Sequence, residues 1–518
     1  MFIKILFLVV FFALMIGIGF YCKKSTKDVD GFLLGGRGVG PWLTAFAYGT
    51  SYFSAVIFIG YAGQFGWKYG LAATWIGLGN TFIGSLFAWN ILGRRTRVMT
   101  QSLNCATMPE FFGKRYDSKA LKLVSSVIIF VFLIPYTASL YNGLSRLFTM
   151  AFGIPYTYCI IVMSVLTGIY VLVGGYMATA INNFIQGLIM LVGIVAVIIA
   201  VLKGQGGFTN AVTTLSQQSL KGNAQQGVFT SFFGPDLWNL VGVVILTSLG
   251  TWGLPQMVQK FYSITDQRAI KKGTVISTVF ALIVAGGCYF LGGFGRLFAD
   301  KIEFSANGTP VYDSIIPTML SGLPDILIGL VVILVLSASM STLSSLVLTS
   351  GSTITIDFIA PLKRKEMTEK NKMLIIRIFI VVFIVISAVL AIIQANSSVT
   401  FIAQLMGVSW GALAGAFLAP FLYGLYFKKT TKAGVWAGML LGAGIMIANV
   451  TCSLTHTTFI NTYFSSPINA GVLAMLSGLV VVPLVSLFTP KIDKKFVDKV
   501  FSCYNEKITV SKKNALED

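Results

Sequence analysis

The sequence predicts an all-α protein that crosses a membrane many times. Of its 518 residues, 55% are hydrophobic and only 11% are charged. The chain repeatedly runs through about 18 or more apolar residues, the length that an α-helix needs to span the hydrocarbon core. In lipid the backbone must satisfy its own hydrogen bonds, so these runs are expected to be helices. A soluble domain of this size could not bury so much apolar surface.

Thirteen apolar runs are long enough to count as spans. They lie at about residues 2–22, 40–64, 70–93, 123–151, 156–174, 180–203, 237–259, 274–296, 322–358, 376–395, 400–427, 433–454 and 468–489. The first run resembles a signal peptide in length, but its basic residues follow the apolar stretch and no small-residue cleavage site does. We therefore expect an uncleaved helix whose N-terminus lies outside.

The basic residues that give the net charge of +20 lie mostly in the predicted inner loops. With the N-terminus outside, the inner segments carry 31 of the 38 Lys and Arg residues, and Lys260 is counted at the start of one of them. This bias predicts an N-out, C-in orientation by the positive-inside rule. Because the basicity reports topology, it predicts no nucleic-acid partner.

The residues that support enzyme chemistry are scattered. The six cysteines form no CxxC pair, and the single histidine, His456, falls in a predicted outer loop. No catalytic or nucleotide-binding motif stands in a usable context, so we expect neither an enzyme nor a cofactor. The acidic residues all fall in loops, tails or helix ends, with Asp357 nearest to a buried position. Since proton-driven carriers usually keep an ionisable relay in the membrane, a cation held by neutral oxygens is the better expectation.

One apolar span contains a segment rich in hydroxyl groups, residues 337–345. Six of its nine residues are Ser or Thr, and none is charged. At about 3.6 residues per turn, Ala338, Ser341, Thr342 and Ser345 share one helix face. Two interpretations remain open on this segment alone. Small hydroxyl residues often pack helices together in membranes, and a row of neutral oxygens also suits a dehydrated Na⁺.

Two spans carry residues that interrupt a helix. Gly, Thr and Ser cluster around 49–53 in the second span, and Gly250, Gly253 and Pro255 lie together in the seventh. Each is the first span of a set of five, which predicts an inverted-repeat transporter with its site at the unwound points. The expected repeats are 40–203 and 237–427. They are flanked by an extra helix and inner loop (1–39), two further helices (428–489) and an inner tail (490–518).

Five stretches carry a resemblance to a known family: 31–41, 174–186, 253–261, 338–342 and 426–434. On these the chain resembles the sodium:solute symporter family, whose members carry proline, sialic acid, sugars, iodide or vitamins. The resemblance implies a leucine-transporter-like fold of five plus five helices in the plasma (inner) membrane. It also implies Na⁺-coupled import of a small organic solute by alternating access. An uncoupled facilitator or channel is the alternative.

The resemblance implies where Na⁺ would bind. The main site would use the backbone carbonyls of Thr50, Phe53 and Ala338 and the hydroxyls of Ser341 and Thr342. Some members bind a second cation, and Ser344 and Ser345 match its serines. Asn183 stands where those members have Asp. The lost negative charge weakens that second site, so one Na⁺ per cycle is expected.

The implied solute site lies beside the same breaks. Its expected lining is Tyr52, Ser54, Thr251, Trp252 and Pro255. Pro255 matches a residue of proline carriers, whereas Tyr52, Thr247 and Thr251 depart from them. The solute therefore stays open between an amino acid such as proline and a monocarboxylate or sugar acid.

Two further features concern side chains away from the breaks. Arg146 either attracts a carboxylate or extends to the outer headgroups. Gly434, Gly438 and Gly442 recur every fourth residue, which favours close helix packing and says nothing about oligomers. A monomer is the expected functional unit.

Overall fold

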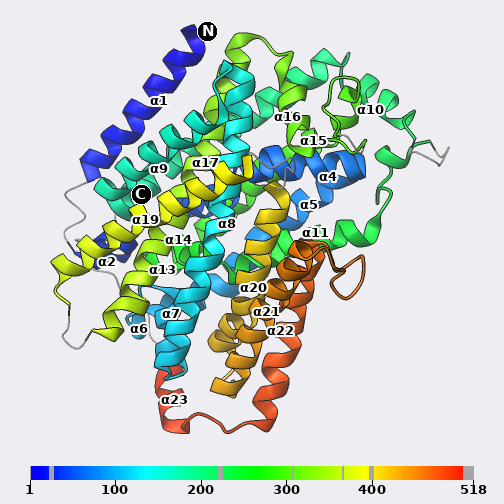
Figure 1. Cartoon of the computed structure of the whole chain (residues 1–518). Helices are drawn as coiled ribbons and strands as arrows, with labels where there is room; N and C mark the ends of the chain where they lie inside the picture. The colour runs from blue at the N-terminus through cyan, green and yellow to red at the C-terminus, as the bar shows by residue number, and fades with distance from the viewer. Residues whose placement is uncertain are drawn as a thin grey trace.

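The computed structural model describes residues 2–22, 28–219, 226–305, 308–363, 367–395 and 402–505. Across these ranges the chain forms a bundle of helices, with two isolated bridges and no β-sheet. The N-terminal helix α1 lies on one side of the bundle, and α20, α21 and α22 lie together on the other (Figure 1).

The helices differ widely in length. The longer ones are α1 Phe2–Tyr21, α8 Lys119–Phe152, α9 Tyr156–Gly204, α14 Gln267–Ala281, α17 Asp325–Thr353, α19 Glu369–Ala395, α20 Ile402–Tyr426, α21 Lys432–Leu454 and α22 Pro467–Phe488. The shorter ones are α2 Val29–Leu34, α3 Pro41–Tyr52, α4 Ala62–Tyr69, α5 Thr74–Gly79, α6 Arg94–Ser102, α7 Met108–Arg115, α10 Phe208–Ser216, α11 Leu237–Leu249, α12 Pro255–Val258, α13 Lys260–Ser263, α15 Gly287–Gly292, α16 Tyr312–Ser321, α18 Ala360–Leu362 and α23 Lys494–Ser502.

Ten helical stretches within the described ranges are long and apolar enough to cross a membrane, or eleven when the bent pair at 237–263 counts as one span. Predicted spans five and six form the single helix α9, which changes direction at Gly175, where φ is 56° and ψ is −149°. Only glycine adopts such a backbone readily. A many-helix membrane fold is thus confirmed, whereas the number thirteen and the N-out, C-in orientation stay predictions.

The first predicted break lies at the end of α3. This helix begins with Pro41 at its first position and ends at Tyr52. Near its end, the hydroxyls of Thr50 and Ser51 donate to the carbonyls one turn earlier, at 2.7 and 2.6 Å. Phe53 is extended (φ −83°, ψ 125°), and helical geometry resumes at Ala55. The break therefore falls at 53–54, the C-terminal edge of the predicted stretch.

The second predicted break separates α11 from α12. A 3₁₀ turn covers Gly250–Gly253, and Leu254 is extended (φ −82°, ψ 120°). Pro255 then opens α12, where its missing N–H removes no helical hydrogen bond. The two halves of this span are bent by 57°. Both interruptions predicted from the sequence are therefore confirmed.

Helix α17 is the central element of the bundle. Every residue from Val331 to Thr353 is buried. Over this stretch apolar and hydroxyl side chains surround the helix without a charge, which is typical of a helix enclosed by others. At the N-terminal end of α17, Lys4 of α1 forms an ion pair of 2.9 Å with Asp325. The hydroxyl-rich segment is thus enclosed by protein.

Helices α20, α21 and α22 pack closely through the glycines of α21. A Cβ built on Gly442 would lie 2.2 Å from the carbonyl carbon of Gly415 on α20. One built on Gly434 would lie 2.1 Å from Ser486 Oγ on α22. The predicted role of this glycine repeat in helix packing is confirmed.

Candidate cation and solute site

The hydroxyl-rich face of α17 meets the break that follows α3. Ser341 Oγ donates to the carbonyls of Thr50 and Ala338, both at 2.9 Å. Thr342 Oγ1 lies 3.1 Å from the Ala338 carbonyl and 3.3 Å from those of Thr50 and Phe53. All five residues are buried. The structure therefore brings the complete predicted Na⁺ ligand set to one point.

This point holds more acceptors than donors. Two hydroxyl protons serve four converging carbonyls, because the Ser51 carbonyl also lies 3.4 Å from Thr342 Oγ1. Helix α3 ends here, so the negative end of its dipole points at the same place. Converging oxygen lone pairs without enough donors attract a hard cation. The geometry suits Na⁺, whose binding here stays a prediction.

The two serines of the second candidate cation site lie one turn further along α17. Ser345 Oγ lies 2.9 Å from Ser51 Oγ and donates to the Ser341 carbonyl at 3.1 Å. Ser344 Oγ donates to the same carbonyl at 2.9 Å. Asn183 on α9 is fully buried, and neither of its amide atoms has a hydrogen-bond partner among the described residues.

Two residues near this second site were missed in the sequence. One is Ser51, whose hydroxyl faces Ser345. The other is Lys260, whose Nζ lies 3.0 Å from Ser345 Oγ and whose side chain is buried. From the sequence alone, Lys260 is expected in an inner segment. The structure extends the broken span to Ser263, so Lys260 lies within it.

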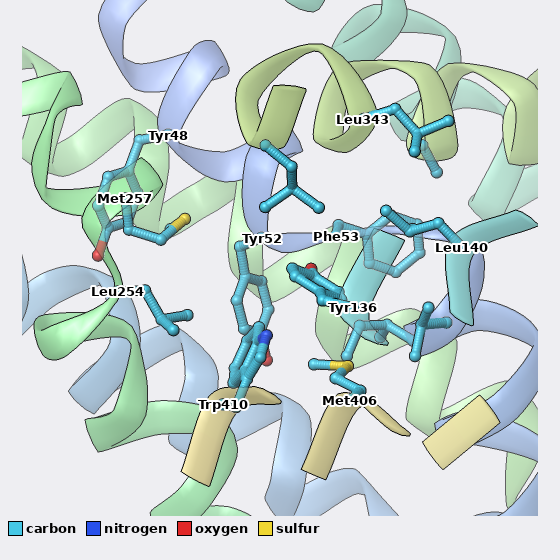
Figure 2. Close-up of a cluster of buried hydrophobic side chains, with 14 of the residues drawn as sticks. Tyr48, Tyr52, Phe53, Tyr136, Leu140, Leu254, Met257, Leu343, Met406 and Trp410 are labelled. Carbon is cyan, nitrogen blue, oxygen red and sulfur yellow. The ribbon is translucent and has the colours of Figure 1, made fainter. Parts of the chain in front are cut away.

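An aromatic cluster lies beside the first break. The ring of Trp410 on α20 is 5.8 Å from that of Tyr52 and 5.9 Å from that of Tyr136 on α8. Figure 2 shows these three side chains turned toward one another. Tyr52 OH, Ser54 Oγ, Tyr136 OH and Trp410 Nε1 are buried, and none of them forms a well-aligned hydrogen bond with a described residue. Tyr136 OH interacts weakly with Ser54 and Trp410, and Tyr52 OH interacts weakly with Thr247. Unpartnered buried polar groups are rare in proteins, so this cluster is the best candidate for holding a polar solute.

The residues that the sequence predicts to line the solute site at the second break differ in what they contact. Thr251 Oγ1 donates to the Ser248 carbonyl at 2.8 Å, and Trp252 Nε1 donates to the Ile83 carbonyl at 2.9 Å. Pro255 stands at the break itself. Tyr52 and Ser54 thus join the aromatic cluster, whereas Thr251 and Trp252 are already engaged by backbone. Sequence reasoning missed Tyr136 and Trp410, because an aromatic residue in an apolar span carries no local mark.

Arg146 has an acidic neighbour. It is half-buried in the C-terminal part of α8, and its charge acts on the buried Asp313 of α16. Burial raises the pKa of Asp313 from 3.8 to about 6, while the Arg146 charge and a hydrogen bond from the Ile402 N–H oppose that rise. An internal carboxyl therefore already attracts Arg146.

Replacing Asp313 by Asn is expected to raise the melting temperature of the purified protein at neutral pH. The folded pKa of about 6 exceeds the ordinary 3.8, so the stability from the protonated carboxyl is complete below pH 4 and is lost as pH rises through 6. The separation of the two pKa values corresponds to roughly 3 kcal/mol. The variant should lose this pH dependence, whereas Asn at the exposed Asp300 should keep it. If the melting temperatures of the wild type and of Asp313→Asn depend on pH in the same way, Asp313 is not the group that causes this pH dependence.

Comparison with known proteins agrees with this architecture. The profile of the sodium:solute symporter family matches residues 32–442. The osmoregulated proline transporter of Bacillus subtilis (strain 168) is 29% identical over 475 residues, covering 91% of this chain and 93% of that protein. The sodium/proline symporter of Staphylococcus aureus (strain JH9) is 29% identical over 500 residues, covering 94% and 92%.

A solved structure shares the fold. It is the substrate-bound, outward-open state of a Na⁺-coupled sialic acid symporter, with a TM-score of 0.78 and 18% identity. The match covers 95% of this chain and 99% of that one. The leucine-transporter-like fold is therefore confirmed. Since the family profile spans most of the chain, this multi-pass plasma-membrane protein belongs to the sodium:solute symporter family and couples the import of a small solute to Na⁺.

Proposed function

We propose that the protein imports proline, or an amino acid of similar size, together with one Na⁺ per cycle. The observation that carries the cation site is the convergence of the Thr50, Phe53 and Ala338 carbonyls on Ser341 and Thr342. Both curated relatives described above are proline transporters by name, and each aligns over more than nine-tenths of this chain. These two lines of support are independent.

The aromatic cluster supports a small solute with an anionic end. The O–H groups of Tyr52 and Tyr136 and the N–H of Trp410 are buried donors that form no well-aligned hydrogen bond with the described residues. A carboxylate supplies acceptors, and the rings supply apolar surface for a compact hydrocarbon part. A monocarboxylate or sugar acid would use the same donors. Proline is favoured because its ring is apolar and small.

Coupling to one Na⁺ provides enough energy for accumulation. Moving one charge inward across about 100 mV yields roughly 2.3 kcal/mol. A tenfold Na⁺ gradient adds about 1.4 kcal/mol. Together they support solute accumulation of roughly a few hundred-fold.

The test is uptake of radiolabelled proline by the purified protein in liposomes, with an inward Na⁺ gradient and a negative interior. We expect accumulation that requires Na⁺, that excess unlabelled proline abolishes, and that sugars and neutral vitamins leave unchanged. Protein-free liposomes are the control. Uptake that continues without Na⁺ under an imposed pH gradient would refute the coupling. Na⁺-dependent uptake of a sugar acid instead of proline would refute only the solute.

We also propose that transport is the sole activity, with no enzymatic step and no cofactor besides the coupling Na⁺. One chain supplies α3 with the break that follows it, α17, α8 and α20, which together contribute every residue of the Na⁺ site at Ser341 and Thr342 and of the aromatic cluster. A monomer is therefore the proposed functional unit. Uptake per protein that stays constant when liposomes contain at most one copy would support it.

A further inference from the structure

Lys260 is a buried basic side chain that the candidate Na⁺ and solute sites leave unexplained. Its side chain is only 3% exposed, and no described carboxylate acts on it. Its Nζ donates to Ser345 Oγ at 3.0 Å and lies 5.1 Å from the centre of the Tyr176 ring. A buried ammonium without a counter-ion is costly unless neutral oxygens and aromatic faces replace its water. These are the same kinds of groups that hold a metal cation.

The group that Lys260 contacts belongs to the second candidate cation site. Ser345 Oγ also lies 2.9 Å from Ser51 Oγ, which belongs to the first broken helix. Lys260 itself stands on α13, the inner half of the second broken helix. One ammonium therefore joins both broken helices through a single serine of α17.

Asn183 lies at the same depth in the bundle. On α9, Gly193 packs against Leu334, and a Cβ built on Gly187 would lie 3.1 Å from Thr50 Cγ2. The Thr50 carbonyl accepts a hydrogen bond from Ser341. Residue 193 of α9 therefore lies level with residue 334 of α17, and residue 187 lies level with about residue 341. The numbering falls along α9 as it rises along α17, so the two helices are antiparallel. One further turn on the same face of α9 places Asn183 beside the level of Ser345. Its amide is buried without a described partner.

We propose that the Lys260 ammonium is the built-in occupant of the second candidate cation site and takes the place of a second Na⁺. The proposal rests on the Na⁺-coupled function described above and deepens it. Two cations cannot share the Ser345 hydroxyl, because their mutual repulsion in a buried site is strong. Asn183 carries no negative charge, so it cannot offset the repulsion between the ammonium and a second Na⁺. The wild-type protein then binds a single exchangeable Na⁺, at Ser341 and Thr342.

The first experiment counts Na⁺ bound by the purified full-length protein without solute, by equilibrium dialysis with radioactive Na⁺. One Na⁺ per chain is expected for wild type and for Asn183→Asp, whose new carboxylate should pair with Lys260. Two Na⁺ per chain are expected for the double variant Lys260→Met with Asn183→Asp, which removes the ammonium and adds a ligand. Lys260→Arg with Asn183→Asp is the matched control and should bind one.

Three outcomes would overturn the proposal. The wild-type chain could bind two Na⁺, or the Asn183→Asp variant with Lys260 intact could bind two Na⁺. The folded double variant Lys260→Met with Asn183→Asp could bind only one Na⁺. If that double variant does not fold, Asn183→Asp alone decides. Binding of one Na⁺ with a raised melting temperature supports the ion pair, and an unchanged or lowered melting temperature overturns it. If proline proves not to be the transported solute, the number of Na⁺ bound per chain is not affected. Failure of Na⁺ coupling appears separately, as no Na⁺ bound by any variant.

Discussion

Replacing Thr342 by Ala is expected to raise the Na⁺ concentration for half-maximal uptake by at least about tenfold, without reducing the amount of protein in the membrane. Thr342 Oγ1 lies within 3.4 Å of all four converging carbonyls, whereas Ser341 Oγ reaches two of them. The site is enclosed by protein, so water cannot easily supply the missing oxygen. An interaction between a neutral oxygen and a charge is worth about 1.5–3 kcal/mol, or roughly 10- to 150-fold in affinity.

Three matched variants sharpen this prediction. Ser341→Ala should act in the same direction, because it removes the other hydroxyl ligand. Thr342→Ser keeps the oxygen and should be mild. Ser339→Ala should also be mild, since Ser339 Oγ donates to the Val335 carbonyl at 2.8 Å within its own helix. Na⁺ titrations of uptake rate give the comparison. Equal sensitivity of Ser339 and Ser341 would show that the assigned helix face is wrong.

Replacing Trp410 by Phe is expected to raise the KM for the solute by about 10- to 100-fold while leaving the Na⁺ dependence nearly unchanged. The substitution keeps an aromatic ring against Tyr52 and Tyr136 but removes the buried Nε1 donor, which forms no well-aligned hydrogen bond with a described residue. If that donor binds a carboxylate, its loss costs about 1.5–3 kcal/mol. Tyr136→Phe should have a similar effect for the same reason.

Trp252→Phe is the contrasting variant. The Trp252 N–H already donates to the Ile83 carbonyl, so its loss should affect stability more than solute affinity. Solute KM at saturating Na⁺ and melting temperature together separate the two effects. A larger rise in KM for Trp252→Phe than for Trp410→Phe would place the solute on the other side of the break.

The class of fold and the cation-binding face of α17 follow from the sequence alone. Long apolar runs must be helices in lipid because no solvent is present to satisfy the backbone. The breaks were visible because Gly250, Gly253 and Pro255 act locally on the backbone. The shared face of Ala338, Ser341 and Thr342 follows from helix periodicity alone. These features depend on residues close together in the chain.

Only the tertiary structure decided what meets those local features. Tyr136 and Trp410 lie far from Tyr52 in the chain and reach it through the packing of α8 and α20 against the first break. From the sequence alone, Lys260 is indistinguishable from the other basic residues at the predicted inner ends of spans. Whether such a side chain extends to the headgroups or turns inward depends on the neighbours that receive it, here Ser345 and Tyr176. The sequence around Lys260 contains neither of these residues, so its burial follows from the fold.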